Sequence, residues 1–172
     1  MSFKLDLHVH TESHGKTLIN AGQLRQSFRN NNINGIAVAN FFDISHALWL
    51  KKKLQEFIVI IGQEIWTNDG HVIGLGLKER IADFQDAADT IGLIHDQGGL
   101  AVAPHPSLSL GVGEKAKSLP LDAIEVYSGL IGVTVLFNHK AKKLAEMMNV
   151  AQVASTDTTD PRLVGRSHTE VF

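Results

Sequence analysis

The stretch KLDLHVHTE, residues 4–12, decides how the rest of this chain is interpreted. Three aliphatic residues alternate with polar neighbours, a pattern that predicts a β-strand. Residues two apart on a strand point the same way, so the imidazoles of His8 and His10 can reach one point. Neutral imidazole is the commonest metal ligand in proteins. The pair, preceded by Asp6 at the end of an apolar strand, therefore favours a metal site over two unrelated structural histidines.

Short apolar runs alternate with helical patterns along the whole chain. The expected strands are 3–9, 35–39, 57–61, 72–77, 100–103, 123–127 and 150–154, and the expected helices are 20–31, 44–55, 83–97 and 132–148. Continuous apolar strands suit a parallel sheet that is buried on both faces. The alternating order predicts an α/β fold with right-handed crossovers, either a closed barrel or an open doubly wound sheet.

The composition is typical of a globular protein and argues against a disulfide-bonded, membrane-spanning or duplex-binding protein. The 172 residues are 44% hydrophobic and 20% charged, and their net charge is −2. We expect one domain over residues 1–172, with no disulfide or thiolate chemistry because cysteine is absent. No apolar run is long enough to cross a membrane, and a cytoplasmic location is the default expectation. Beyond Lys51–Lys53 there is no basic cluster, which argues against binding a nucleic-acid duplex.

Ligand-type side chains recur where strands end, which is where loops converge in α/β folds. Those that follow strands are His8, His10, Glu64, His105 and Asp157, while His71 begins a strand seven residues after Glu64. A short loop would bring His71 and Glu64 together. Each residue has an ordinary alternative, such as a surface carboxylate, a histidine in a proline-shaped loop or a turn cap. Six such groups at one end of a barrel would be costly to desolvate without partners, and divalent cations resolve that cost.

These residues resemble the motifs of the polymerase and histidinol phosphatase (PHP) family. The motifs are, in order, DLHVHT (6–11), GIAVANF (35–41), GQEI and HVIGL (62–65 and 71–75), GGLAVAPHP (98–106), DAIEV (122–126), and Asp157 followed by VG (164–165). Their order and spacing cover nearly the whole chain. The resemblance implies a distorted seven-stranded β/α barrel, TIM-like, that holds up to three divalent metals and hydrolyses phosphate esters.

Two departures from the family pattern fall on one metal site. The family's Thr-Asp-His becomes Ala39-Asn40-Phe41, and its Ser-Asp-Ala-His becomes TDTT at 156–159. In the family both lost histidines belong to the third metal, together with the position of His14. The resemblance implies that the first metal uses His8, His10, Glu64 and Asp157, and that the second shares Glu64 and adds His71 and His105. The resemblance therefore implies a two-metal centre.

The predicted activity is hydrolysis of a small phosphate ester or nucleotide by a hydroxide that two metals activate. Mixed imidazole and carboxylate ligands suit Zn²⁺, Mn²⁺ or Fe²⁺. His14 is the candidate proton donor, and Arg162 the candidate phosphate-binding residue. Two alternatives stay open: a catalytically degenerate module that binds metal or a ligand, and a metal-dependent hydrolase of a non-phosphate bond. We expect a small phosphorylated substrate, no duplex nucleic acid and no membrane. The apolar end at 169–172 resembles a strand that either packs across the barrel floor or leaves an edge for a second subunit to cover, and we expect a homodimer.

Overall fold

A computed structural model of the chain describes residues 2–129 and 135–172. Its main sheet has eight strands in the order β10-β1-β4-β5-β6-β7-β8-β9. The strands are β1 (Phe3–Val9), β4 (Gly35–Val38), β5 (Ile58–Thr67), β6 (Gly70–Leu75), β7 (Leu100–Ala103), β8 (Ala123–Ser128), β9 (Ala151–Ser155) and β10 (Thr169–Val171). Seven of these form the expected distorted barrel, which confirms the predicted fold class. The eighth, β10, is an antiparallel addition to β1.

The all-parallel expectation is wrong for one strand. β6 pairs antiparallel with both β5 and β7, because β5 and β6 form a tight hairpin in which Thr67 is opposite Gly70. The turn leaves no room for a helical crossover. As a result, the start of β6 lies at the same end of the barrel as the carboxyl ends of the parallel strands.

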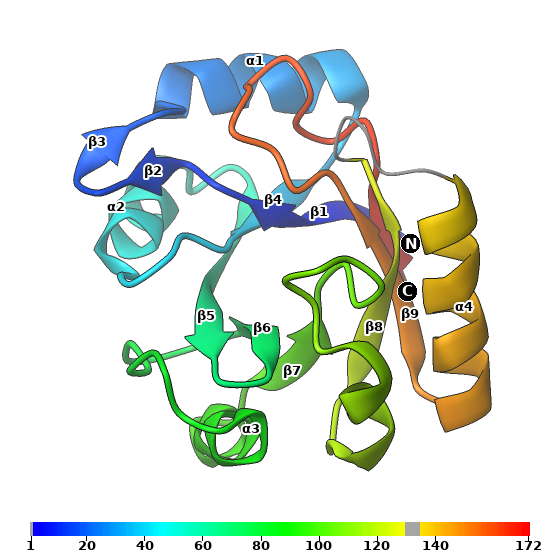
Figure 1. Cartoon of the computed structure of the whole chain (residues 1–172). Helices are drawn as coiled ribbons and strands as arrows, with labels where there is room; N and C mark the ends of the chain where they lie inside the picture. The colour runs from blue at the N-terminus through cyan, green and yellow to red at the C-terminus, as the bar shows by residue number, and fades with distance from the viewer. Residues whose placement is uncertain (1, 130–134) are drawn as a thin grey trace.

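The α-helices of the described residues lie around the outside of the barrel, as Figure 1 shows. They are α1 (Ala21–Asn31), α2 (Ser45–Lys53), α3 (Ala87–Asp96) and α4 (Val135–Met148). Asn20 and Gln23 form a capping box at the start of α1. Residues 132–134 of the last predicted helix lie outside the described residues. A short hairpin, β2 (Glu12–Ser13) and β3 (Lys16–Thr17), and a 3₁₀ helix, η1 (Gly113–Ser118), were not expected. None of the described helices is long and apolar enough to span a membrane.

The barrel closes where the segment after β9 meets the end of β1. The backbone N–H of Asp157 donates to the carbonyl of His8 at 2.9 Å, and that of His10 donates to the carbonyl of Thr158 at 3.0 Å. Lower in the barrel, the Thr169 side chain of β10 bonds both the N–H and the carbonyl of Ala154 at 2.9 Å. These bonds bring the two ends of the chain together and fix Asp157 beside His8.

Small and branched side chains fill the barrel interior, and a larger cluster lies between the barrel and its helices. The interior cluster consists of Leu5, Leu7, Ala37, Ala39, Ile73, Leu75, Val102, Ala123 and Val153. Such a narrow interior is packed rather than hollow. The site is therefore confined to the end of the barrel.

Asp6, on β1, is a structural anchor rather than a candidate ligand. Its fully buried carboxylate accepts bonds from the Thr156 N–H at 3.0 Å, the Thr156 hydroxyl at 2.6 Å and the Gly165 N–H at 2.9 Å. Burial raises the pKa of Asp6 to about 6, although these hydrogen bonds oppose the rise. The carboxylate ties β1 to the segment that carries Asp157.

We expect Asp6→Ala to lower the free energy of unfolding by about 3 kcal/mol, because it leaves buried N–H donors without an acceptor. Urea unfolding in the presence of a chelator measures this effect without any contribution from bound metal. Asp96→Ala, at an exposed position of α3, is the matched control and should change stability by less than about 0.5 kcal/mol. A loss in Asp6→Ala no larger than that of the control would contradict the anchoring role.

Candidate functional site

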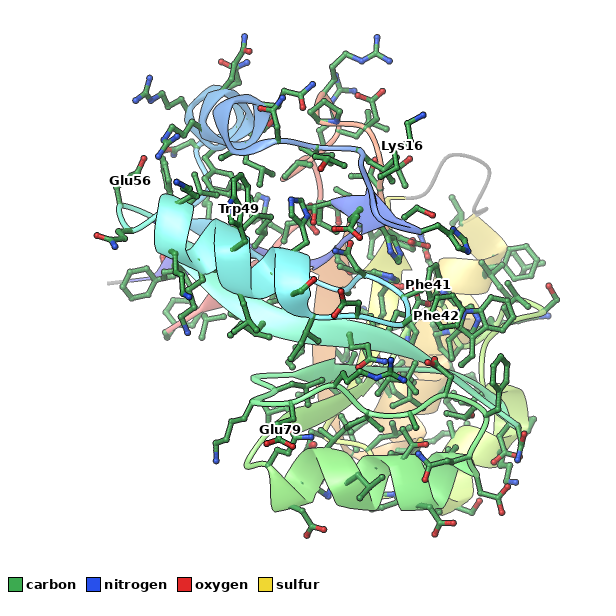
Figure 2. The ribbon with its side chains drawn as sticks, turned by 90° about the vertical axis from the view of Figure 1, so that its left-hand side faces the viewer. Lys16, Phe41, Phe42, Trp49, Glu56 and Glu79 are labelled. Atoms are coloured by element: carbon green, nitrogen blue, oxygen red, sulfur yellow. The ribbon has the colours of Figure 1, made fainter. Side chains whose placement is uncertain are left out.

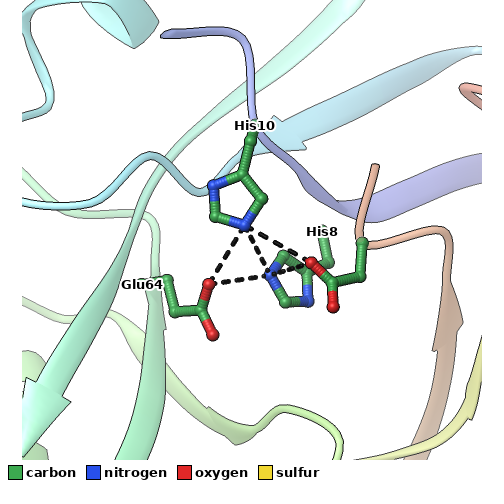
Figure 3. Close-up of side chains that lie close together, drawn as sticks. His8, His10 and Glu64 are labelled. Carbon is green, nitrogen blue, oxygen red and sulfur yellow. Dashed lines mark hydrogen bonds and ion pairs between the residues drawn. The ribbon is translucent and has the colours of Figure 1, made fainter. Parts of the chain in front are cut away.

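The structure brings all six predicted ligand residues to the carboxyl end of the barrel. They form two groups that share one carboxylate: His8, His10, Glu64 and Asp157 in the first, and Glu64, His71 and His105 in the second. Figure 3 shows one carboxylate oxygen of Glu64 joined by dashed lines to the rings of both His8 and His10, which lie on the same side of it. The shared residue lies on β5, which the backbone of Phe41 flanks through a parallel bridge.

The first group is spaced like donors around one cation. Nε2 of His8 lies 3.2 Å from Nε2 of His10, and each lies 3.1 Å from Oε2 of Glu64. Oδ1 of Asp157 is 3.3 Å from the first nitrogen and 3.4 Å from the second. Ligands about 2.0–2.1 Å from a tetrahedral zinc ion are about 3.3 Å apart, so these donor atoms fit such an ion.

The second group uses the other oxygen of Glu64. Oε1 lies 2.7 Å from Nδ1 of His71 and 3.1 Å from Nε2 of His105. The remaining ring nitrogens, Nε2 of His71 and Nδ1 of His105, are buried and have no hydrogen-bond partner among the described residues. The nitrogens that face Oε1, Nδ1 of His71 and Nε2 of His105, are the atoms that could hold a cation together with Glu64. The chain thus has two groups of residues that could hold metal.

The electrostatics of the first group favour positive charge. Burial lowers the pKa of His8, but the charges of Asp157 and Glu64 outweigh it and raise that pKa well above its usual value. Burial opposes ionisation of Glu64, yet the surrounding histidines hold its pKa well below the usual range. His8 likewise outweighs burial at Asp157 and lowers its pKa. Buried carboxylates of this kind require protonated imidazoles or metal cations as partners.

Glu125 is a buried carboxylate beside the cluster that the ligand prediction did not include. Its Oε1 lies 3.3 Å from Nδ1 of His8 and accepts a bond from the Ser155 hydroxyl. Its Oε2 accepts the backbone N–H of His105 at 2.8 Å. A carboxylate on the far nitrogen of a histidine fixes the orientation of that ring. The sequence places Glu125 in an expected strand, and the structure shows that it is buried there, at only 2% exposed.

Backbone geometry positions His105 and Asp157. Both have positive φ, 30° and 49°, which is uncommon outside glycine. The loop after β7 folds back so tightly that a Cβ on Gly111 would lie 2.5 Å from the His105 carbonyl oxygen. In the same loop, the carbonyl of Leu110 accepts a hydrogen bond from the backbone N–H of His71 at 2.8 Å. Gly111 therefore permits the close packing that holds the two histidines beside Glu64.

A cavity of about 370 Å³ opens onto the cluster. Its lining includes His10, Glu64, His71, His105 and Asp157, with Glu12, Ser13, Leu18, Phe41, Leu108, Ser109, Leu110 and Thr159 around them. Phe41 and Thr159 are the residues that replace the family's histidines. The Phe41 ring stacks on the His10 ring, with centroids 4.7 Å apart. Asn40 turns away from the cavity, and its Oδ1 accepts the N–H of Thr11 at 2.7 Å.

His14 and Arg162 do not join the six residues. His14 is exposed on the β2–β3 hairpin, and its ring bonds the hydroxyl of Ser13 at 2.9 Å. The Arg162 side chain is 84% exposed and pairs with Asp160. It lines a separate surface cleft beside α1. Neither residue lines the cavity in this structure.

Comparison with solved structures defines the class of fold. The chain aligns with a two-domain protein from Bacteroides vulgatus that contains a predicted PHP-like metal-dependent phosphoesterase, with a TM-score of 0.72 and 15% identity over 94% of this chain. It spans about half, 53%, of that protein. An amidohydrolase from Chromobacterium violaceum aligns with a TM-score of 0.76 and 15% identity over 96% of this chain and 91% of its own. Endonuclease Q, solved with a 27-mer duplex substrate, aligns with a TM-score of 0.71 and 12% identity over 99% of this chain and 53% of its own.

The fold is that of a protein with a PHP-like domain, in agreement with the fold that the sequence resemblance implies. Within that class it belongs to one family with an uncharacterized protein of Methanocaldococcus jannaschii. The two are 32% identical over 139 residues, which are 73% of this chain and 81% of the relative. No family model matches the chain.

Proposed function

We propose that the chain is a metal-dependent phosphoesterase with two divalent ions in the cavity at the carboxyl end of its barrel. The observation that carries this proposal is the shared carboxylate. Glu64 is 1% exposed, and its two oxygens each contact a different set of imidazoles. A carboxylate between two cations is typical of two-metal hydrolytic sites.

The metal ligands in this proposal are His8, His10, Glu64 and Asp157 for one ion, and Glu64, His71 and His105 for the other. When bound, the ions would supply a nucleophile from water at neutral pH and neutralise charge on the phosphoryl oxygens. The mixed donor set suits Zn²⁺, Mn²⁺ or Fe²⁺. Glu125 is a positioning residue that keeps the His8 ring oriented.

The proposal also requires residues around the cavity that transfer a proton and bind the substrate. Glu12, on the hairpin, lines the cavity and is a candidate for proton transfer to a leaving group. His14 belongs to the same hairpin and keeps the role of proton donor only if the hairpin turns its ring inward on binding. Arg162 would likewise need to leave Asp160 to reach a phosphate.

Turnover of an aryl phosphate by reconstituted protein tests the proposal. Apoprotein loaded with Mn²⁺ or Zn²⁺ should release nitrophenol from mono- or bis-(4-nitrophenyl) phosphate. Asp157→Ala should lose at least about 100-fold in kcat/KM, whereas Asp96→Ala, an exposed control, should match the native protein. Activity that survives in Asp157→Ala would show that the cluster is not its source.

The strongest rival is a module that binds metal or a ligand without catalysis. The placement of His14 and Arg162 outside the cavity favours it. Protein that binds two ions but turns over no substrate would support this rival. Turnover of a nitroanilide without turnover of phosphate esters would instead assign the hydrolysis of a non-phosphate bond.

Domain organisation, substrate, location and oligomeric state are further parts of the proposal. We propose that residues 1–172 form one domain, since a single sheet links β1 to β10. A small phosphorylated substrate, a cytoplasmic location and a homodimer stay predictions, and light scattering at micromolar concentration tests the last. The absence of duplex binding also stays a prediction, because a fold shared with Endonuclease Q at 12% identity argues neither way.

A further inference from the structure

Apart from the candidate ligands, the described walls of the cavity beside the cluster are largely apolar. Its walls beyond the candidate ligands are Leu18, Phe41, Leu108 and Leu110, with the small polar residues Ser13, Ser109 and Thr159. Among the described residues, neither lysine nor arginine lines it, and its one further charged residue is Glu12. A site for a highly charged phosphate would be expected to include arginine or lysine.

Phe41 is fixed in this wall by aromatic contacts. Its ring packs on His10 at 4.7 Å between centroids, meets His71 edge-on at 5.6 Å and lies 5.8 Å from Trp66. Figure 2 shows Phe41 next to Phe42 on the segment that leads into α2. The half-buried ring thus packs into the cavity wall, directly beside a candidate ligand. A fixed aromatic surface of this kind suits a planar apolar group.

The charges in the cavity limit what can bind next to the ions. The cluster already contains Glu64 and Asp157, and Glu12 adds a third carboxylate to the lining. A phosphate monoester carries close to two negative charges at neutral pH. Beyond the charge that the ions themselves offset, its second charge would face carboxylate and aliphatic side chains, and neither lysine nor arginine among the described lining residues. A phosphodiester carries a single charge, and its second ester group is uncharged.

We infer that the site selects a singly charged phosphodiester with a planar apolar substituent, which packs against Phe41. This inference rests on the proposed function. In the reaction, the oxygen of water forms a new bond to phosphorus and the bond to the leaving oxygen breaks. The leaving oxygen takes one proton of the water, and the products are a phosphate monoester and an alcohol or phenol.

Ligand binding by metal-loaded protein tests the selection without requiring turnover. Calorimetric titration compares diphenyl phosphate, dimethyl phosphate and phenyl phosphate. Diphenyl and dimethyl phosphate have the same charge, but only the first carries aromatic rings. We therefore expect diphenyl phosphate to bind at least about 10-fold more tightly than dimethyl phosphate. Phenyl phosphate, with its extra charge, should bind more weakly than diphenyl phosphate.

Substitution of Phe41 separates the ring from general apolar bulk. In Phe41→Leu and Phe41→Ala the preference for diphenyl over dimethyl phosphate should fall by about 3- to 10-fold. Phe3→Ala, at the opposite end of β1, is the control and should keep the full preference. Ion content, measured for each variant, shows that the cluster is intact.

The outcomes separate this inference from the proposed function. Equal binding of diphenyl and dimethyl phosphate overturns the apolar subsite, and tighter binding of phenyl phosphate overturns the charge selection. A preference that survives in both Phe41 variants overturns the role of the ring. A clear preference for diphenyl phosphate in protein that hydrolyses no ester supports the subsite and contradicts the proposed activity alone.

Discussion

Replacing Glu64 with glutamine should abolish metal binding at both groups and lower kcat/KM by at least about 10³-fold. Glu64 is the one carboxylate that both groups share, with Oε2 facing His8 and His10 and Oε1 facing His71 and His105. An amide is a weaker ligand than a carboxylate and brings no charge to offset a cation. Elemental analysis should find less than one ion per chain in this variant.

The matched control is Glu79→Gln, which makes the same chemical change at an exposed position on the loop before α3. It should retain full ion content and activity. Because glutamine has nearly the size of glutamate, the loss in Glu64→Gln should occur without unfolding, and circular dichroism checks this. Native activity in Glu64→Gln would contradict the role of Glu64 as the carboxylate shared by two metal ions.

Removal of metal should lower the melting temperature by at least about 10 °C. An ion that binds only the folded chain stabilises it by about 2.7 kcal/mol when its free concentration is 100 times its Kd. In a chain of this size each kcal/mol shifts Tm by about 2–4 °C. Two ions therefore give a large effect, and calorimetry with and without chelator measures it.

The Glu64→Gln variant provides the control for chelation. Since it should hold little metal, chelator should change its Tm by only a few degrees. A native chain whose Tm is insensitive to chelator and to added Zn²⁺ or Mn²⁺ would speak against metal in the folded state. Reloading after chelation should restore the original Tm if the loss was caused by the ions.

Local periodicity was enough to predict part of the cluster. The strand alternation of residues 4–12 places His8 and His10 on one face, and their Nε2 atoms lie 3.2 Å apart. The strand-end rule located Glu64, His105 and Asp157, because carboxyl ends of parallel strands meet at one end of a barrel. The close spacing of Glu64 and His71 also predicted their contact, although the reason is the β5–β6 hairpin.

Other features depend on tertiary contacts that no local pattern encodes. Glu125 looks like any acid in a strand, and only the assembled barrel shows its contact with His8. The replacement of a family histidine by Phe41 was visible in the sequence, but its stacking on His10 was not. The roles predicted for His14 and Arg162 assumed that their loops face the cavity. Arg162 instead pairs with Asp160, a contact that depends on the folded loop and that its sequence does not reveal.

The most direct test is the number of divalent ions bound per chain in protein purified without chelator and then dialysed against Zn²⁺, Mn²⁺ or Fe²⁺. Two groups that share Glu64 predict about two ions per chain for at least one of these metals. Binding of none of them at micromolar concentration would contradict the metal centre and with it the hydrolytic mechanism.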